Sequence, residues 1–193
     1  MPRHMTRHLL IAALAVFTFS FRAAAAEATV ADRACEQEMA AASAKYTVPL
    51  GVLYAIGLTE SGRKQSLQRN AMNIEGQPYF AVSLSDGLRH FDEAQASGKI
   101  LIDIGCMQIN HHFHGSAFSS VEQMFDPHAN VDYAARFLKV LRQREGSWTM
   151  AVARYHAGPN NDPAQKQYVC AVITNMVATG FGAWTQPSHD FCR

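Results

Sequence analysis

The sequence predicts a mainly α fold of the α+β class, in which a small β-hairpin is inserted into one helical domain. Apolar residues recur at helical spacing through most of the chain, and capping residues mark where these segments start and end. Only residues 71–74, 79–83 and 99–104 show the shorter pattern of strands. The chain has 193 residues, of which 48% are hydrophobic, no internal repeat and no linker, so we expect one domain with a sizeable core.

The first 26 residues have the pattern of a secretory signal peptide. Basic residues and histidines at positions 3–8 precede an apolar run over 9–21, and four alanines end at Ala26. The run is shorter than the ~20 residues that span a membrane, which disfavours the alternative of a retained anchor. We therefore expect cleavage after Ala26 and a single mature domain over residues 27–193.

The expected mature chain is close to neutral. Cleavage would leave 14 of the 17 basic residues against 16 acidic ones, a net charge of about −2, with no stripe of Lys and Arg. Nucleic acid is therefore not an expected partner.

Four cysteines lie in the part of the chain that we expect to be secreted: Cys35, Cys106, Cys170 and Cys192. In an oxidising compartment they favour two disulfides over a metal-thiolate site, and none forms a C-x-x-C pair. Three connectivities are possible. We favour Cys35 with Cys106 and Cys170 with Cys192, because the second bond would hold a C-terminal tail that has few other anchors.

Two helices are expected first, over about 30–46 and 51–60. The first is amphipathic, and the second is apolar on nearly every side, as in a core helix. Pro49 suits the first helical turn, and Gly62 is expected to end the second helix in the left-handed conformation.

The second helix carries one carboxylate, Glu60, in its last turn. Burial and the negative end of the helix dipole both disfavour ionisation there. A carboxylic acid that keeps its proton near neutral pH is a candidate general acid. The alternative is that Glu60 ends a core helix and points to water.

The middle of the chain is expected to hold the β element. Residues 71–74 and 79–83 predict a short hairpin or an extended loop. A helix capped by Ser85 or Asp86 follows to about Ser97, where Gly98 ends it. Residues 99–104 alternate polar and apolar side chains, the pattern of a short strand.

The rest of the chain predicts four helices and a tail. Two overlapping capping-box patterns at 119–123 start a short helix. The next three are expected at 127–145 after the cap Asp126, at 148–157 after the cap Ser147, and at 162–178. An irregular tail then carries Trp184 and Cys192.

Three segments stand out together: TESG at 59–62, GCMQIN at 105–110 and ARYHAGPN at 153–160. They resemble, in the same order, three motifs of the soluble lytic transglycosylase (SLT) family: a Glu-Ser pair at the end of a buried helix, Gly-x-Met-Gln, and Ala-x-Tyr-Asn-Ala-Gly. The resemblance covers roughly residues 35–178 and implies a lysozyme-like fold of the goose type. The chain looks most similar to the small, single-domain members that accompany secretion, conjugation or flagellar machines.

The resemblance implies a periplasmic lytic transglycosylase, a carbon-oxygen lyase. Such an enzyme cleaves the β-1,4 bond between N-acetylmuramic acid and N-acetylglucosamine in peptidoglycan, and leaves 1,6-anhydromuramoyl ends. The expected partners are glycan strands and components of an envelope-spanning machine for which the cell wall is opened locally. A monomer without a cofactor is expected.

By the same resemblance, Glu60 is the catalytic residue. It would protonate the glycosidic oxygen and then accept the proton of the muramic C6 hydroxyl. One carboxylate suffices, because the attacking hydroxyl belongs to the substrate and the N-acetyl group can stabilise the cationic centre. Asp103 is the nearest candidate for a second carboxylate, although we expect it to hydrogen-bond backbone.

Six further residues are expected to bind substrate or support the site, and one of them, His156, is described below with the departures from the motifs. Gln108 matches the motif glutamine and has two possible roles, binding sugar or holding a loop carbonyl. The Tyr155 hydroxyl could bond the catalytic carboxyl or its ring could pack in the core. Ser61 follows the acid, where it could instead satisfy the helix end. Asn110 ends its segment, and Met107 is expected to pack as core or groove wall.

The chain departs from the motifs at two positions. His156 stands where the family has an asparagine amide. Cys106 takes a position that is often aliphatic, and a bond to Cys35 would tie the site to the first helix.

Three other functions compete with this interpretation. A metal hydrolase would use the histidines at 111, 112, 114, 128 and 156, but no recognised ligand spacing such as H-E-x-x-H is present, so no metal is expected. A lysozyme-type muramidase would cut the same bond with water. A non-catalytic scaffold would bind glycan strands without cutting them.

Overall fold

Helices form most of the domain in the computed structural model, which describes residues 33–63, 66–158 and 162–193. The domain is one compact unit, Ala34–Arg193. The predicted signal peptide lies outside the described residues. So do positions 30–32 of the expected first helix and positions 159–160 of the third motif segment.

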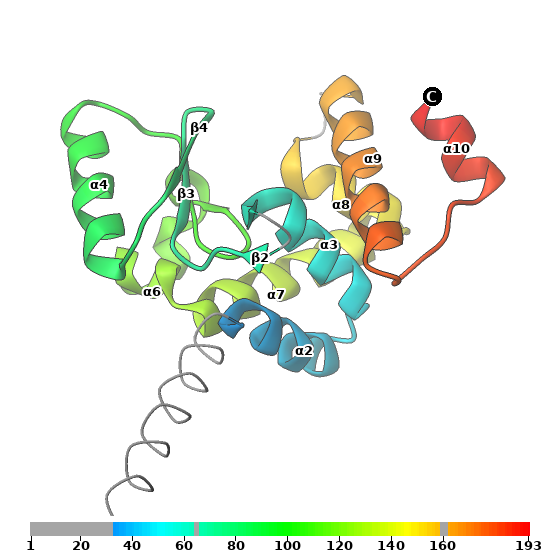
Figure 1. Ribbon diagram of the computed structural model, residues 1–193, viewed down its shortest axis with the longest axis horizontal. Helices are drawn as coiled ribbons and strands as arrows, with labels where there is room; N and C mark the ends of the chain where they lie inside the picture. Colours follow the sequence, from blue (N-terminus) through cyan, green and yellow to red (C-terminus); the bar gives the residue numbers. More distant parts are fainter. Residues whose placement is uncertain (1–32, 64–65, 159–161) are drawn as a thin grey trace, which may run out of the picture. The chain divides into compact units, whose positions relative to one another are not determined.

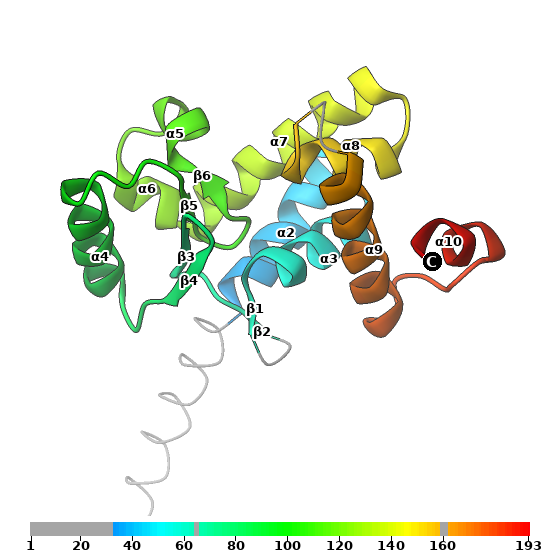
Figure 2. The same ribbon diagram turned by 90° about the horizontal axis from the view of Figure 1, so that it is seen from above.

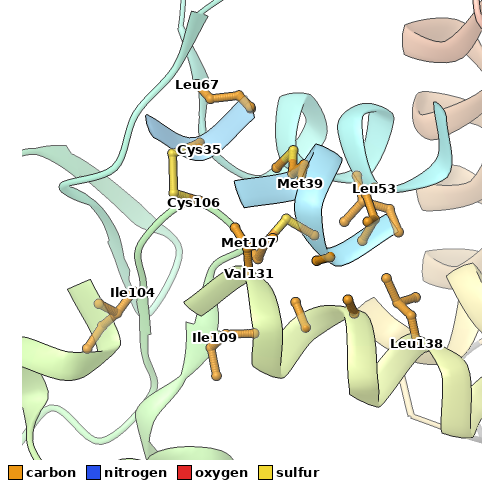
Figure 3. Packing of buried hydrophobic residues seen from close by; sticks show 14 of the residues in the cluster. Cys35, Met39, Leu53, Leu67, Ile104, Cys106, Met107, Ile109, Val131 and Leu138 are labelled. Carbon is orange, nitrogen blue, oxygen red and sulfur yellow. A yellow bond between two sulfur atoms is a disulfide. The ribbon is translucent and has the colours of Figure 1, made fainter. Parts of the chain in front are cut away.

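The core is built around the predicted apolar helix. This helix, α3 (Leu50–Ser61), packs against α2 (Ala34–Tyr46) and α9 (Asp162–Ala178), and Figure 1 shows it between the two. The long helix α7 (Pro127–Glu145) packs against α2 and against α8 (Trp148–His156). Figure 3 shows Met39, Leu53 and Leu138 meeting from three of these helices. The predicted mainly α class is confirmed.

Both ends of α3 differ from the prediction. Pro49 precedes the first helical residue and is not part of the first turn. Gly62 is extended, with φ −66° and ψ 129°, and not left-handed. A side chain at Gly62 would collide with the carbonyl oxygen of Leu58, so close backbone approach is what requires glycine here.

The β element is a four-stranded antiparallel sheet, larger than the predicted hairpin. Its order is β4-β3-β5-β6, from β3 (Ala71–Ile74), β4 (Gln77–Phe80), β5 (Ile102–Ile104) and β6 (Ile109–Asn110). The second hairpin arm is β4, two residues earlier than expected, because Glu75 and Gly76 both have positive φ and form a two-residue turn. A separate two-stranded sheet joins β1 (Gly62–Arg63) to β2 (Ser66–Leu67).

The remaining helices follow their caps. Ser83 caps α4 (Leu84–Ala96), so the expected caps Ser85 and Asp86 are wrong. Ser120 caps α6 (Val121–Phe125), Asp126 caps α7 and Ser147 caps α8, as predicted. The short helices α5 (His111–His114) and η1 (Gly115–Ala117) were not predicted.

The C-terminal tail is not irregular. It forms α10 (Gln186–Cys192), which begins with a capping box between Thr185 and Ser188. Figures 1 and 2 show α10 beside α9, with α4 and the sheet at the opposite end of the domain.

Two disulfides join Cys35 to Cys106 and Cys170 to Cys192, which is the pairing we favoured. The first ties the second motif segment to α2 (Figure 3), and the second ties α10 to α9. In the described parts of the chain, no helix combines the length and the hydropathy that a membrane crossing requires.

Candidate active site

The three motif segments meet at one cleft of about 390 Å³. Glu60 reaches it from the end of α3, the second segment from the turn between β5 and β6, and the third from the end of α8. The residues that line the cleft are Glu60, Asn73, Glu75, Gly76, Leu101, Asp103, Gln108, Ile109, Asn110, Phe113, His114, Phe137, Tyr155 and His156. Five of the seven predicted site residues are therefore brought together, and Ser61 and Met107 lie behind the cleft wall.

Glu60 is a largely buried carboxyl that favours its protonated form. Its side chain is 15% exposed. The pKa of Glu60 is raised to about 8, chiefly by burial and to a lesser extent by the nearby Asp103, while a hydrogen bond from Tyr168 acts in the opposite direction. Oε2 makes no hydrogen bond to any described residue, so it can carry the proton toward a ligand. Glu60 therefore holds its proton at neutral pH, as the sequence indicated.

The hydrogen-bond partner of Glu60 is Tyr168 and not Tyr155. The Tyr168 hydroxyl on α9 donates to Glu60 Oε1 over 2.6 Å. The Tyr155 hydroxyl donates instead to the Met107 carbonyl over 2.8 Å, so of the two roles left open for Tyr155 the bond to the catalytic carboxyl is not formed. Tyr155 still lines the cleft and fastens α8 to the second segment. Sequence reasoning missed Tyr168 because it lies outside the three segments, at an inward position of a helix where an aromatic residue is usually core.

Of the two roles predicted for Gln108, the structure shows the second, holding loop carbonyls. Its Nε2 donates to the carbonyls of Ala71 and Gly105 over 3.0 and 2.9 Å. Gln108 has φ 46°, a left-handed conformation that these bonds hold in place. The residue thus shapes the cleft wall, and its side chain is partly committed to backbone.

Asn110 and Asp103 are partners. Asn110 Nδ2 donates to Asp103 Oδ1 over 2.7 Å, so the expected backbone partner of Asp103 is wrong. Burial raises the pKa of Asp103, and the Asn110 bond opposes this. Asn110 Oδ1 also accepts from the backbone N–H groups of His112 and Phe113, which caps α5.

Ser61 and Met107 support the site from behind. The Ser61 hydroxyl lies 3.2 Å from the Gly57 carbonyl oxygen and 2.8 Å from that of Cys106, so it joins the end of α3 to the second segment. Met107 is fully buried in the core. Ser61 therefore satisfies the helix end, and Met107 packs in the core, as the sequence allowed for each.

A buried amide that the sequence did not reveal fixes the second segment. Asn130 on α7 donates from Nδ2 to the carbonyls of Ile104 and Met124, and its Oδ1 accepts from the Met107 N–H. Gly105 has φ 82°, and a Cβ there would lie within 3 Å of the Asn130 amide. On sequence alone, Asn130 is one polar residue on an amphipathic helix, and no motif marks it.

His156 covers the Glu60–Tyr168 pair. Its ring is parallel to that of Tyr168, with centroids 4.3 Å apart and an interplanar angle of 2°. His156 Nδ1 lies 3.9 Å from Glu60 Oε1, beyond hydrogen-bond distance. Partial burial lowers the pKa of His156, so the ring is neutral at pH 7. The ring therefore limits the access of water to the carboxyl.

We expect His156→Ala to lower the pKa of Glu60, because water would then reach the carboxyl and stabilise its charged form. His156→Phe should keep the pKa near that of the unaltered protein, since a phenyl ring can occupy the same stacked position. Titration of ¹³C-labelled glutamate carboxyls by NMR measures both. An unchanged pKa in His156→Ala would contradict the shielding role.

The other histidines have protein partners. His111 stacks edge-on against Phe91, His114 Nδ1 lies 2.8 Å from the Tyr133 hydroxyl, and His128 pairs with Glu38. Within the described ranges, no three His, Cys, Asp or Glu side chains are grouped so that they could hold a metal ion.

The mainly α domain, its small antiparallel sheet and the buried Glu60 carboxyl in the cleft agree with a lysozyme-like fold. The profile of the transglycosylase SLT domain family matches residues 37–175, most of the chain. The protein is therefore a member of the transglycosylase SLT domain family, a transglycosylase-type enzyme with peptidoglycan as its implied substrate. Comparison with curated proteins and comparison with solved structures each gave no match.

Proposed function

We propose that this protein is a lytic transglycosylase that cleaves the β-1,4 bond between N-acetylmuramic acid and N-acetylglucosamine and leaves 1,6-anhydromuramoyl ends. The observation that carries the proposal is the Glu60 carboxyl, which lies in the cleft and whose pKa of about 8 keeps it protonated at neutral pH.

Glu60 acts twice in the proposed mechanism. It first donates its proton to the glycosidic oxygen as the bond from that oxygen to C1 breaks. The positive charge at C1 is shared with the substrate's own N-acetyl group. The Glu60 carboxylate then removes the proton of the C6 hydroxyl while O6 bonds to C1. The proton returns to Glu60, so the cycle consumes no water and needs no second carboxylate.

Tyr168 assists the middle of this cycle. Its hydroxyl donates to Glu60 Oε1, a bond that strengthens when the carboxyl becomes an anion. The same bond keeps the carboxyl in one orientation between its two proton transfers.

We further propose that the protein is a periplasmic monomer that opens the cell wall locally for a secretion, conjugation or flagellar assembly. Two disulfides are typical of an oxidising compartment, and residues 1–26 have the pattern of a cleavable signal. The resemblance to small, single-domain members of the family supports the link to an envelope assembly.

Digestion of purified peptidoglycan, followed by mass spectrometry of the products, tests the proposed reaction. We expect 1,6-anhydromuramoyl ends. Reducing ends would indicate a lysozyme-type hydrolase, and intact strands a binding scaffold, so either result would contradict the proposal.

Activity should fall as the pH rises through about 8, the pKa of Glu60. The acid form is required, and it is fully populated only below that pKa, so kcat/KM should be flat toward neutral pH and drop about tenfold per pH unit above 8. The pH profile of kcat/KM on soluble glycan strands measures this. A drop that begins near pH 4.5, the ordinary value for glutamate, would show that the pKa of Glu60 is not raised and would contradict its role as an acid protonated at neutral pH.

A further inference from the structure

Part of the cleft lining consists of exposed apolar side chains. Phe113 of α5 is 67% exposed and Leu101, just before β5, is 41% exposed, and both line the cleft. Figure 2 shows α5 beside β5 and β6. Large apolar side chains left in water beside a cleft are typical of a binding surface.

Phe113 is mounted on a helix that is fixed on three sides. Asn110 caps α5, His111 stacks against Phe91, and His114 bonds to Tyr133. The residues before and after Phe113 are thus held, while its own ring lies next to the rings of His112 and His114. A rigidly mounted ring loses little conformational entropy when it binds a ligand.

The charge of the cleft favours the sugar rings of peptidoglycan over its peptide stems as the part that is recognised. None of the described lining residues is Lys or Arg, and the carboxylate of Glu75 is paired with Lys99. Burial lowers the pKa of His114 and of His156, so both are neutral at pH 7. The carboxylates of a peptide stem find no counter-charge here, whereas the uncharged C–H face of a sugar ring fits an aromatic side chain.

We propose that Phe113 is a stacking platform for an N-acetylhexosamine ring, and that this cleft recognises peptidoglycan through its sugars and gains no affinity from the peptide stems. The inference rests on the proposed function for its substrate class. It implies that glycan strands with few or no stems, the product of a reaction that hydrolyses the amide bond between the lactyl group and the stem, are bound at least as well as strands that carry stems.

Binding in the Glu60→Gln background tests the platform without turnover. The probe is an oligosaccharide of N-acetylglucosamine, titrated by NMR. Phe113→Ala should weaken its binding about 5- to 10-fold, and Phe113→Trp should retain it. Phe191→Ala is the matched control, since Phe191 is 43% exposed but lies on α10, outside the cleft. Equal affinity of the Phe113→Ala and Phe191→Ala variants for the oligosaccharide would overturn the proposed role of Phe113.

The contribution of the peptide stems to binding is tested by comparing glycan strands that carry stems with strands from which an amidase has removed the stems. The KM of the unaltered enzyme for stem-free strands should be equal to or lower than that for stem-bearing strands. A KM at least fivefold lower for stem-bearing strands would overturn the inference while leaving the proposed function intact. Conversely, a protein that binds the oligosaccharide through Phe113 but yields no anhydro ends would contradict the proposed function alone.

Discussion

Glu60→Gln should lower the rate of anhydro product formation by ~10²-fold or more, because the amide can neither donate the proton to the leaving oxygen nor remove the one from the C6 hydroxyl. The rate of product release from purified peptidoglycan measures the loss. Glu75→Gln is the matched control. It alters another glutamate of the same cleft, whose carboxylate is paired with Lys99, and should change the rate little.

The same substitution should raise stability at pH 7. The pKa of Glu60 in the fold, about 8, lies above its ordinary value of 4.5, so its stabilising contribution is complete below pH 4.5 and is lost as the pH rises to 8. At pH 7 the free energy of unfolding is therefore about 3 kcal/mol lower than it is with Glu60 fully protonated. Glutamine does not titrate, so the variant does not suffer this loss. In thermal unfolding, the Glu60→Gln variant should have a higher Tm than the unaltered protein at pH 7, and a similar Tm at pH 4. An inactive Glu60→Gln variant that is also less stable at pH 7 would point to misfolding and remove the support for catalysis.

Asn130→Ala should destabilise the fold by about 3 kcal/mol or more. It removes three hydrogen bonds at once and leaves the carbonyls of Ile104 and Met124 and the N–H of Met107 buried without partners. Chemical denaturation gives the free energy of unfolding.

The control for Asn130 is Asn175→Ala, since the Asn175 amide donates one partly buried bond to Thr59. We expect a loss of no more than about 1 kcal/mol there. Equal losses in both variants would show that Asn130 does not hold the second motif segment.

The sequence predicted most helices of the fold because their signals are local. The apolar surface of α3 and the cap Asp126 each depend on neighbours within a few positions. The placement of Glu60 at a buried helix end was foreseen for the same reason.

The interactions that the sequence did not reveal connect residues far apart in the chain. Tyr168 bonds Glu60 across 108 positions, and Asn130 bonds Met107 across 23. The partner of Tyr155 was missed for a related reason: Tyr155, Glu60 and Met107 lie in three different segments, and only the fold decides which of the other two the phenol reaches. The wrong prediction of a left-handed Gly62 has another cause. Glycine there relieves a backbone clash, which sequence does not distinguish from a left-handed turn.

Isotopic labelling of the products tests directly whether Glu60 turns the substrate's own hydroxyl into the nucleophile. Peptidoglycan is digested in H₂¹⁸O, treated with borohydride, which reduces hemiacetal ends but not anhydro ends, and analysed by mass spectrometry. The proposed mechanism predicts muramoyl ends without ¹⁸O that resist reduction, formed by the unaltered enzyme and by Asp103→Asn but not by Glu60→Gln. Reducible muramoyl ends that carry ¹⁸O would show that water attacks C1 and would contradict it.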